Sequence, residues 1–510
     1  MHSRPFLFIS MKRFLYILPI VFCLSCAVTK APKEEFRGVW IATVANIDWP
    51  KNPSDDVKKK KSDFIALLDF YQELNFNAAI VQVRTAGDAL YQTDLAPWSR
   101  YLTGKDGKAL EDFPDPLQWM IAETHKRGME FHAWLNPYRA TIDLDTTSLS
   151  KQHDFHQHPD WMVKYGKKYY YNPGLPEVRQ KFSKIIEELV TGYEVDAIHF
   201  DDYFYPYKVK GEVFKDSATF ATYGLPNQNI EDWRRSNVDS LVKDVHHTIK
   251  KNKPWVQFGI SPFGVWKNKS TDPRGSDTQA GQTTYEDLYA DPLLWVEKGW
   301  LDYLAPQVYW SMDYPVASHK KITTWWANTT PNTHLYIGNG TYKIKNNPDK
   351  AWKRNNEIPK QLAFSRQQNN INGNIFFSAK SLVGQHEKVT QKLQKKFYKL
   401  PVQNPGPLNH IKRTVAIPAV ESVQKHGNQL KVCVSHSDSI PRYVLLYELN
   451  PKTKEPKTLI GTAYLSESQD LGCLQIEFDR KYIKKNMAVV VRDAYGNQSS
   501  AQLLDQNPMD

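Results

Sequence analysis

Cysteine is scarce in this sequence, with 4 residues among 510. Cys23 and Cys26 stand near the amino terminus and Cys433 and Cys473 near the carboxyl terminus, so no group of cysteines and histidines has the spacing of a zinc site. No G-x-G-x-x-G motif follows a predicted strand, which argues against a dinucleotide-binding fold. We therefore expect a protein without a metal ion or an organic cofactor.

Long apolar runs and concentrated charge are lacking too. After residue 26 no segment is apolar enough to cross a membrane, which takes about 20 apolar residues. Lys and Arg total 66 against 55 Asp and Glu, and the excess is spread along helix-like stretches such as Lys58–Lys61. Because no recognised nucleic-acid-binding module is present, we expect no nucleic-acid partner and only a mild attraction to anionic envelope polymers.

Residues 1–26 are interpreted as a lipoprotein signal peptide that ends at a lipidated cysteine. Met11–Ser25, MKRFLYILPIVFCLS, has a basic start, an apolar run and a final small residue, and Cys26 follows directly. A plain anchor helix is the less favoured alternative, because the apolar run is shorter than a membrane-spanning helix requires. We expect Cys26 to carry a lipid that attaches the protein to a membrane.

Residues 27–400 are predicted to form one domain, because from about Phe36 to Ser378 short apolar runs alternate with amphipathic stretches, which is the pattern of a parallel sheet covered by helices. Several helical stretches open with Pro and close with Gly, as Pro176–Gly192 does. The eight predicted strands are Gly38–Val44, Ala78–Val83, Glu130–Leu135, Ala197–Asp201, Val256–Ser261, Tyr303–Tyr309, Leu335–Gly338 and Asn374–Phe377. This α/β pattern predicts a (β/α)8 TIM-like barrel with enlarged loops, and a doubly wound sheet is the alternative.

A Pro-rich linker, residues 401–410, follows the predicted barrel and begins PVQNPGP. Residues 411–510 then read as short alternating strands, which predicts a small all-β sandwich of immunoglobulin or fibronectin type with an accessory role. Cys433 and Cys473 fall in its strands and can be oxidised in an exported protein, although the sequence does not give the distance between them. A chain that ends near Val402 is expected to fold without this domain.

The chemistry is expected at Val195–Tyr207, VDAIHFDDYFYPY. Its apolar strand ends in Asp201 and Asp202, and a segment rich in aromatic residues follows. An unpaired charge is costly to bury, and the carboxyl ends of barrel strands are where reacting groups lie. We interpret the pair as catalytic, against the alternative that an Asp caps the next helix or pairs with an arginine.

Polar and aromatic residues follow the other strands and converge on the same predicted rim. Such groups donate to hydroxyls, accept from hydroxyls and stack on ring faces, which suits a carbohydrate better than a phosphate or a metal ion. The predicted substrate-binding residues are Asp48, Trp49, Arg84, Asn136, Tyr138, Arg139, Tyr203, Tyr205, Trp266, Gln307, Tyr309 and Trp310.

Five stretches resemble one known family, the glycosyl hydrolase-like family 10: FRGVWIATVANIDWP, DPLQWMIAETHKRGMEFHAWLNPYR, VDAIHFDDYFYPY, ISPFGVWKNKSTDPRGSDT and LDYLAPQVYW. The resemblance runs from about Phe36 to Tyr398 and does not include the β domain. It implies a (β/α)8 barrel and glycan hydrolysis, and it is particularly similar to bacterial envelope lipoproteins that cleave peptidoglycan glycan strands stripped of their stem peptides. The motif residues that carry over are Asp201, Asp202, Asn136, Tyr138, Arg139, Gln307 and Trp310.

The mechanism is open at this point. Glycosidic hydrolysis normally takes two carboxyl groups, about 5 Å apart in retaining enzymes and about 6.5 to 9.5 Å apart in inverting enzymes. Neighbours in an extended strand point to opposite sides, so Asp201 and Asp202 act together only where the strand has ended. A conventional mechanism would take a further acid from Asp277, Glu286 or Asp48.

The same stretch also looks like the chitinase-type strand D-G-x-D-x-D-x-E. Asp196, His199 and Asp201 fall on its three spaced acids, and Tyr203 stands in place of the Glu. In that mechanism the acetamido group of the substrate attacks, and Asp202 would have to be the acid, with its pKa raised by its neighbour.

We therefore expect a glycoside hydrolase of the bacterial envelope that acts on N-acetylated glycan strands, above all on peptide-free peptidoglycan. The alternatives are a surface hydrolase of another polysaccharide and a catalytically inactive glycan-binding lipoprotein. The resemblance and the signal together imply an outer-membrane lipoprotein facing the periplasm or the cell surface, with other envelope or division proteins as candidate partners.

The lipid anchor gives the first testable prediction. Cys26→Ser removes the thiol that accepts the lipid, so this variant should leave the membrane fraction or remain unprocessed. Fractionation of cells followed by mass spectrometry of the amino terminus measures both outcomes. A wild-type protein that is wholly soluble and carries no lipid would contradict the prediction.

Overall fold

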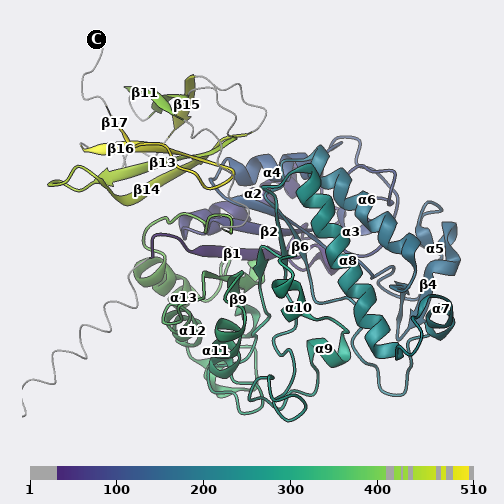
Figure 1. The fold of residues 1–510 in the computed structure, drawn as a ribbon. Coiled ribbons are helices and arrows are strands. Elements are labelled where there is room, and N and C mark those ends of the chain that lie inside the picture. Colours follow the sequence, from purple (N-terminus) through teal and green to yellow (C-terminus); the bar gives the residue numbers. More distant parts are fainter. Residues whose placement is uncertain are drawn as a thin grey trace, which may run out of the picture.

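The structure, a computed structural model, describes residues 32–408, 419–426, 429–434, 440–466, 473–477 and 486–504. Cys26 and the predicted signal peptide lie outside the described residues. The chain forms a barrel and a smaller β domain that stands on one end of it (Figure 1). Within the described ranges, no helix has the length and apolarity that a membrane crossing requires.

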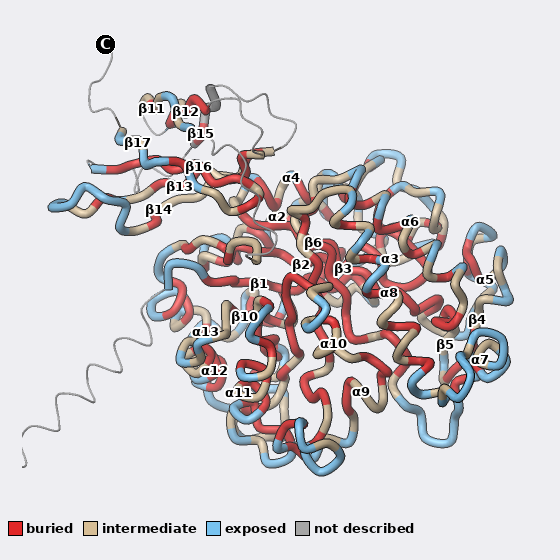
Figure 2. Tube along the Cα trace, in the orientation of Figure 1, coloured by how far each residue is buried: buried red, intermediate tan, exposed pale blue. Residues whose placement is uncertain are grey.

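Eight parallel strands close into the barrel in chain order, and the last strand pairs with the first. They are β1 Phe36–Ile41, β2 Ala78–Arg84, β3 Glu130–Leu135, β6 Ala197–Phe200, β7 Gln257–Ile260, β8 Tyr303–Leu304, β9 His334–Gly340 and β10 Gly373–Phe377. Their residues are almost all buried, and Figure 2 shows the buried positions following the strands at the centre of the barrel. The predicted (β/α)8 barrel is therefore confirmed.

Helices cover the outside of the barrel. They are α2 Val57–Glu73, α3 Arg100–Thr103, α4 Pro116–His125, α5 Asp154–Gln157, α6 Pro176–Gly192, α7 Ser217–Tyr223, α8 Ile230–Asn252, α9 Thr284–Asp287, α10 Pro292–Glu297, α11 His319–Thr329, α12 Glu357–Ser365 and α13 Glu387–Lys392. Their starts follow local chemistry, because Asp56, Asp115 and Asn229 each accept a hydrogen bond from a backbone N–H of the first turn. Pro opens α4, α6 and α10, where a helix needs no N–H donor.

The sixth barrel strand is shorter than the predicted range Tyr303–Tyr309. It ends at Leu304 because Pro306 has no N–H to donate to a neighbouring strand. Gln307 pairs again as an isolated bridge to Phe263 and Gly338. Gln307 is thereby held at the rim of the barrel, at the carboxyl end of β8.

The connection from β3 to β6 contains an inserted pair of strands. β4, Met162–Tyr165, and β5, Lys168–Tyr171, form an antiparallel hairpin that is separate from the barrel sheet. Tyr170 bridges to Arg139, so the hairpin supports the loop that follows β3.

The β domain consists of two antiparallel sheets on a shared apolar core. One sheet contains β14 Pro456–Tyr464, β13 Pro441–Leu449, β16 Met487–Asp493 and β17 Gln502–Leu503, and the other contains β11 Val420–His426, β12 Gln429–Val434 and β15 Cys473–Glu477. Val432 and Val489 belong to the core that the two sheets enclose, as the predicted sandwich requires. Cys433 is disulfide-bonded, and the residue opposite it in the strand register is Cys473.

The β domain docks on the amino-terminal ends of the barrel strands. The Tyr443 hydroxyl donates to Glu130 Oε1 at 3.1 Å, and the Tyr464 hydroxyl donates to Asp196 Oδ1 at 3.0 Å. The Tyr464 ring stacks on His125 with a centroid separation of 3.6 Å. These contacts close the end of the barrel that is opposite the carboxyl ends of the strands.

The segment predicted as a linker lies against the barrel. Gln403 accepts a hydrogen bond from the Glu35 N–H at 3.0 Å, Asn404 Nδ2 donates to the Asn77 carbonyl at 3.2 Å, and the Gly406 carbonyl lies 2.7 Å from His334 Nε2. Residues 403–406 are therefore a strap across the amino end of the barrel, and a boundary after Pro407 keeps it intact.

A chain that ends at Pro407 should fold, because the last barrel strand is complete at Phe377, but it should unfold at a lower temperature than the full chain. Glu130 and Asp196 would lose the hydroxyl donors of the β domain. Tyr464→Phe in the full chain is the matched variant, and we expect it to cost about 1.5–3 kcal/mol, the usual contribution of a hydrogen bond to a charged group.

Thermal unfolding followed by calorimetry measures both changes, and Tyr223→Phe on the exposed helix α7 is the control. Insolubility of the shortened chain, or an unchanged unfolding temperature in both variants, would refute this account of the interface.

Candidate active site

A pocket of about 310 Å³ opens at the carboxyl ends of the barrel strands. Its floor comes from the barrel interior and its walls from the loops that follow the strands. The lining residues are Trp40, Ala42, Val44, Ile47, Gln82, Trp134, Arg139, Asp201, Tyr203, Ser261, Gln307, Tyr309, Tyr342 and Phe377. Among these described residues Asp201 is the one carboxylate.

Asp201 stands directly after β6, where the strand has ended. Its Oδ1 accepts hydrogen bonds from Gln307 Nε2 and from the Asp202 N–H, both at 2.8 Å. Gln307 Nε2 also donates to the Ser261 carbonyl at 3.0 Å, so one amide group links the ends of β6, β7 and β8. Asp201 is 9% exposed and reaches the pocket.

Asp202 lies behind Asp201 and is 2% exposed. Its Oδ2 accepts a hydrogen bond from the Tyr207 hydroxyl, and its carbonyl accepts one from the Phe204 N–H at 3.0 Å. The chain therefore turns immediately after β6, and the strand geometry that would have separated the two carboxyl groups does not apply.

The environment favours a protonated carboxyl in this pair. Burial raises the pKa of Asp201, against the lowering effect of its hydrogen bonds and of the Arg139 charge. Burial and then the charge of Asp201 raise the pKa of Asp202 well above its usual range. Both carboxyl groups are therefore easier to protonate than a free carboxyl group, which is the property that a general acid requires.

Aromatic rings surround the pair. The Arg139 guanidinium lies 4.2 Å from the centre of the Tyr203 ring, and its Nη1 donates to the Thr85 carbonyl at 3.4 Å. Tyr309 stacks on Phe377 with a centroid separation of 5.9 Å. A pocket with flat ring faces, one guanidinium, two side-chain amides and one carboxylate has the composition of a sugar-binding site.

The structure brings five of the predicted site residues together at the pocket: Arg139, Asp201, Tyr203, Gln307 and Tyr309. Trp310 is outside the pocket lining and packs edge-on against Phe263. Phe263 in turn contacts Tyr207, the donor to Asp202. Trp310 therefore does not face the pocket, and it contacts the site through Phe263 and Tyr207.

Four aromatic residues predicted to hold the substrate lie in the core instead: Trp49, Tyr138, Tyr205 and Trp266 are each at most 1% exposed. Trp49 Nε1 donates to the Lys60 carbonyl at 2.7 Å inside α2, and Trp266 Nε1 donates to Asp291 Oδ1 at 3.1 Å. The prediction was wrong for these residues because each loop folds back over the helices, which buries the ring faces that a sugar would need.

Three predicted polar residues brace the loops rather than line the pocket. Asp48 accepts from the Ala42 N–H and the Ser378 hydroxyl, both at 2.8 Å, and so ties the end of β1 to the end of β10. Arg84 Nη1 donates to the Asp88 carbonyl at 3.2 Å. Asn136 Oδ1 accepts from Trp134 Nε1 at 3.1 Å and so holds a ring of the pocket floor.

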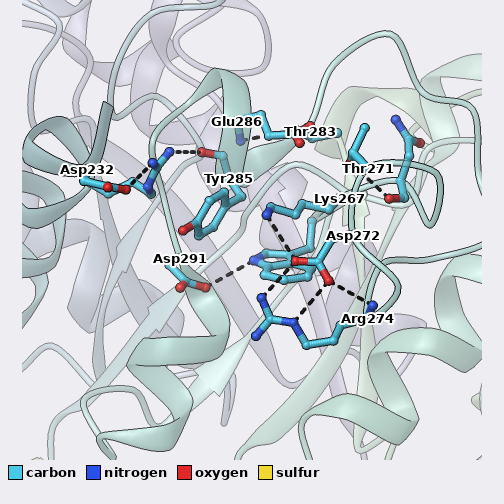
Figure 3. Close-up of polar contacts among 12 residues, drawn as sticks. Asp232, Lys267, Thr271, Asp272, Arg274, Thr283, Tyr285, Glu286 and Asp291 are labelled. Carbon is cyan, nitrogen blue, oxygen red and sulfur yellow. Dashed lines mark hydrogen bonds and ion pairs between the residues drawn. The ribbon is translucent and has the colours of Figure 1, made fainter. Parts of the chain in front are cut away.

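The alternative acids also lie away from the pocket lining. Asp277 is exposed and pairs with Lys321, and Glu286 accepts from the Thr283 hydroxyl at 3.2 Å. Figure 3 shows the surroundings of Glu286, which lies beside Thr283, and a nearby cluster in which Asp272 is held between Lys267 and Arg274. The carboxylate oxygens of Asp48 accept the hydrogen bonds described above and do not line the pocket.

Nine lining residues were not among the predicted site residues: Trp40, Ala42, Val44, Ile47, Gln82, Trp134, Ser261, Tyr342 and Phe377. Three of them, Trp40, Gln82 and Trp134, point into the barrel from the last residues of β1, β2 and β3. Alternation along the strands was the available signal, since every second residue of a barrel strand faces inward. Gln82 Oε1 accepts from the Val44 N–H at 3.0 Å, and its Nε2 has no hydrogen-bond partner among the described residues.

A larger cavity, of about 650 Å³, lies at the other end of the barrel between the strap and the β domain. Asn77, Gln403 and Tyr443 are among its lining residues, and the Asp201–Asp202 pair is remote from it. Throughout the described part of the chain, no group of three His, Cys, Asp or Glu side chains is arranged to hold a metal ion. The predicted carboxyl pair therefore adjoins the smaller pocket and not the larger cavity.

Residues 35–354 match the family model described as Glycosyl hydrolase-like 10, and this match spans more than half of the chain. The chain belongs to this family. It is similar to glycosyl hydrolase YngK of Bacillus subtilis (strain 168), with 43% identity over 444 residues and 86% of each chain covered. It is also similar to glycosyl hydrolase DigH of Escherichia coli (strain K12), with 40% identity over 376 residues, 69% of this chain and 84% of that protein. These relatives confirm the prediction of a glycosidase.

Among solved structures, the PgaB (BpsB) glycoside hydrolase domain from Bordetella bronchiseptica aligns with 12% identity and a TM-score of 0.48, over 72% of this chain and 99% of that one. The catalytic domain of a β-amylase from Paenibacillus polymyxa aligns with 11% identity and a TM-score of 0.46, over 72% of this chain and 98% of that one.

The hydrogen bond from Tyr207 acts to lower the pKa of Asp202. Tyr207→Phe in this glycosyl hydrolase-like 10 protein should therefore raise that pKa further, and the limb of the pH–rate profile that reports Asp202 should move to higher pH. Tyr205→Phe is the matched control, because Tyr205 lies in the same segment and contacts neither carboxyl group. A pH–rate profile that does not move, or that moves equally in the control, would show that the Tyr207 hydroxyl does not control the pKa of Asp202.

Proposed function

We propose that this glycoside hydrolase cleaves glycosidic bonds in N-acetylated glycan strands, with peptide-free peptidoglycan as its substrate, and that Asp201 and Asp202 carry the reaction. The observation that supports this proposal is the buried carboxyl pair at the end of β6, in a pocket walled by aromatic rings. Gln307 orients Asp201 through a hydrogen bond, and the charge of Arg139 acts to lower the pKa of both carboxyl groups.

The pair holds the proton that the leaving-group oxygen needs. Because burial raises the pKa of both carboxyl groups, the pair keeps a proton to higher pH than a free carboxyl group does, and this proton is donated as the glycosidic bond breaks. Hydrogen bonds from Asp202 lower the pKa of Asp201, and the charge of Asp201 raises the pKa of Asp202, so Asp202 is the proposed acid and Asp201, which lines the pocket, orients the acetamido group.

The nucleophile is proposed to come from the substrate. A retaining or inverting enzyme places a second carboxylate about 5 to 9.5 Å from the first, and among the described lining residues Asp201 has no such counterpart. In the substrate-assisted route the acetamido oxygen attacks the anomeric carbon, the leaving oxygen takes the proton, and water then opens the cyclic intermediate. An N-acetylated glycan meets this requirement.

The proposal includes a place in the cell envelope. The signal-like segment before Cys26 and the family resemblance support an outer-membrane lipoprotein facing the periplasm or the cell surface. There the hydrolase would meet glycan strands after other enzymes have removed the stem peptides, and envelope or division proteins are the candidate partners.

Asp201→Asn and Asp202→Asn should each lower kcat on peptide-free glycan strands by about 10²–10⁴-fold, the usual effect of losing a proton-transfer group. Asn keeps the size and the hydrogen-bonding reach of Asp, so the fold should persist. Because the pKa of each buried carboxyl is raised, ionisation destabilises the wild type as the pH rises, and the variants should gain relative stability toward high pH.

Turnover and unfolding temperature, measured across pH, test this prediction. Near-full turnover in both variants, or activity that falls only in step with unfolding, would show that the pair is structural. Product mass spectra on intact peptidoglycan, peptide-free glycan strands, chitin and capsule test the substrate, and exclusive cleavage of capsule would overturn the choice of peptidoglycan.

A further inference from the structure

A column of buried polar side chains runs through the interior of the barrel, from the β domain toward the pocket. Glu130 Oε2 lies 3.0 Å from His132 Nε2, and His132 Nδ1 lies 2.9 Å from the Tyr303 hydroxyl. The same hydroxyl lies 2.9 Å from His199 Nδ1, and His199 Nε2 lies 3.1 Å from Trp40 Nε1. All five side chains are buried.

The sequence makes room for this column. Gly259 of β7 faces the Tyr303 ring, and a Cβ at that position would lie 1.9 Å from the ring carbon that carries the hydroxyl. Any other residue at 259 would displace the one side chain that joins both histidines. The glycine is therefore part of the same arrangement.

The direction of every hydrogen bond in the column follows from its two ends. An indole N–H can only donate, so His199 Nε2 accepts from Trp40 and His199 carries its proton on Nδ1. That proton is donated to the Tyr303 oxygen, and the Tyr303 hydroxyl then donates to His132 Nδ1. His132 carries its proton on Nε2 and donates to the Glu130 carboxylate.

The upper end of the column belongs to the pocket. His199 Nε2 lies 3.1 Å from Ser261 Oγ as well as from Trp40 Nε1, and both Trp40 and Ser261 line the pocket. The Ser261 carbonyl accepts from Gln307 Nε2, which also donates to Asp201. Two residues, Ser261 and Gln307, therefore connect His199 to the proposed reacting group Asp201 through short contacts.

We propose that His199, fixed as its Nδ1–H tautomer by Tyr303, is a positioning residue for hydrolysis: it holds Trp40 in the pocket floor and packs against Ser261, whose hydroxyl donates to the Phe200 carbonyl at 3.2 Å. The inference rests on the proposed function in taking Asp201 as a reacting group. Burial lowers the pKa of His199 well below its usual value, so the ring stays neutral and keeps its acceptor nitrogen. Glu130 is the one carboxylate in the column, and His132 and Tyr303 separate it from His199.

Tyr303→Phe is the test variant, because it removes the hydroxyl that orients His199 and leaves the ring volume in place. Tyr336→Phe is the matched control, since Tyr336 belongs to the same interior cluster and no hydrogen bond joins its hydroxyl to the column among the described residues. We expect Tyr303→Phe to lower kcat about tenfold relative to the control while KM changes little, as misplaced catalytic groups do. Equal turnover in the two variants at equal folded fraction would overturn the proposal.

A second measurement does not depend on activity. Long-range ¹H–¹⁵N NMR of the full chain labelled on histidine reports which ring nitrogen is protonated, and His199→Gln assigns the His199 signal. We expect an Nδ1–H ring for His199 at every pH from about 5 to 8. An Nε2–H ring in the wild type would refute the inference even if Tyr303→Phe failed to fold, whereas full activity of Asp201→Asn would refute the proposed function and leave the tautomer unaffected.

Discussion

Closure of β10 onto β1 is the constraint on which the rest of the structure depends. The two strands pair in parallel from Phe36 opposite Gly373 to Val39 opposite Phe376. Gly373 is required at this seam, because a Cβ there would lie 2.1 Å from the Phe36 carbonyl oxygen. Once the seam is closed, all eight carboxyl ends meet at one rim, and residues as distant in sequence as Asp48 and Ser378 come into contact.

The same closure explains what the sequence could and could not predict. The eight strands and the barrel were predictable because runs such as Ala78–Val83 carry apolar residues on both faces, with Gln82 as the exception, and alternate with amphipathic helices. Asp201 was predictable because a carboxylate that ends a buried strand has few structural uses. Gln307 and Arg139 were predictable because each is a polar residue near the carboxyl end of a predicted strand, within a stretch that resembles the family.

The wrong predictions concern the direction in which the side chains of loop residues point. Trp49 and Trp266 follow strands just as Tyr309 does, and sequence alone does not distinguish a ring that turns back over a helix from one that turns toward the pocket. Trp40 and Trp134 were missed for the opposite reason, because a residue inside a strand is expected to belong to the core. In this barrel the top of the core is the floor of the pocket.

The strap that joins the barrel to the β domain also fixes an orientation. Glu35 hydrogen-bonds to Gln403 at the amino end of the barrel, so the described chain begins on the face opposite the pocket. With the anchor proposed at Cys26, eight residues connect the lipid to that face and span at most about 29 Å. An enzyme anchored in this way would have the amino ends of its barrel strands and the β domain next to the membrane, and the pocket on the side away from it. It would then reach polymer in the space beyond the membrane instead of at its surface.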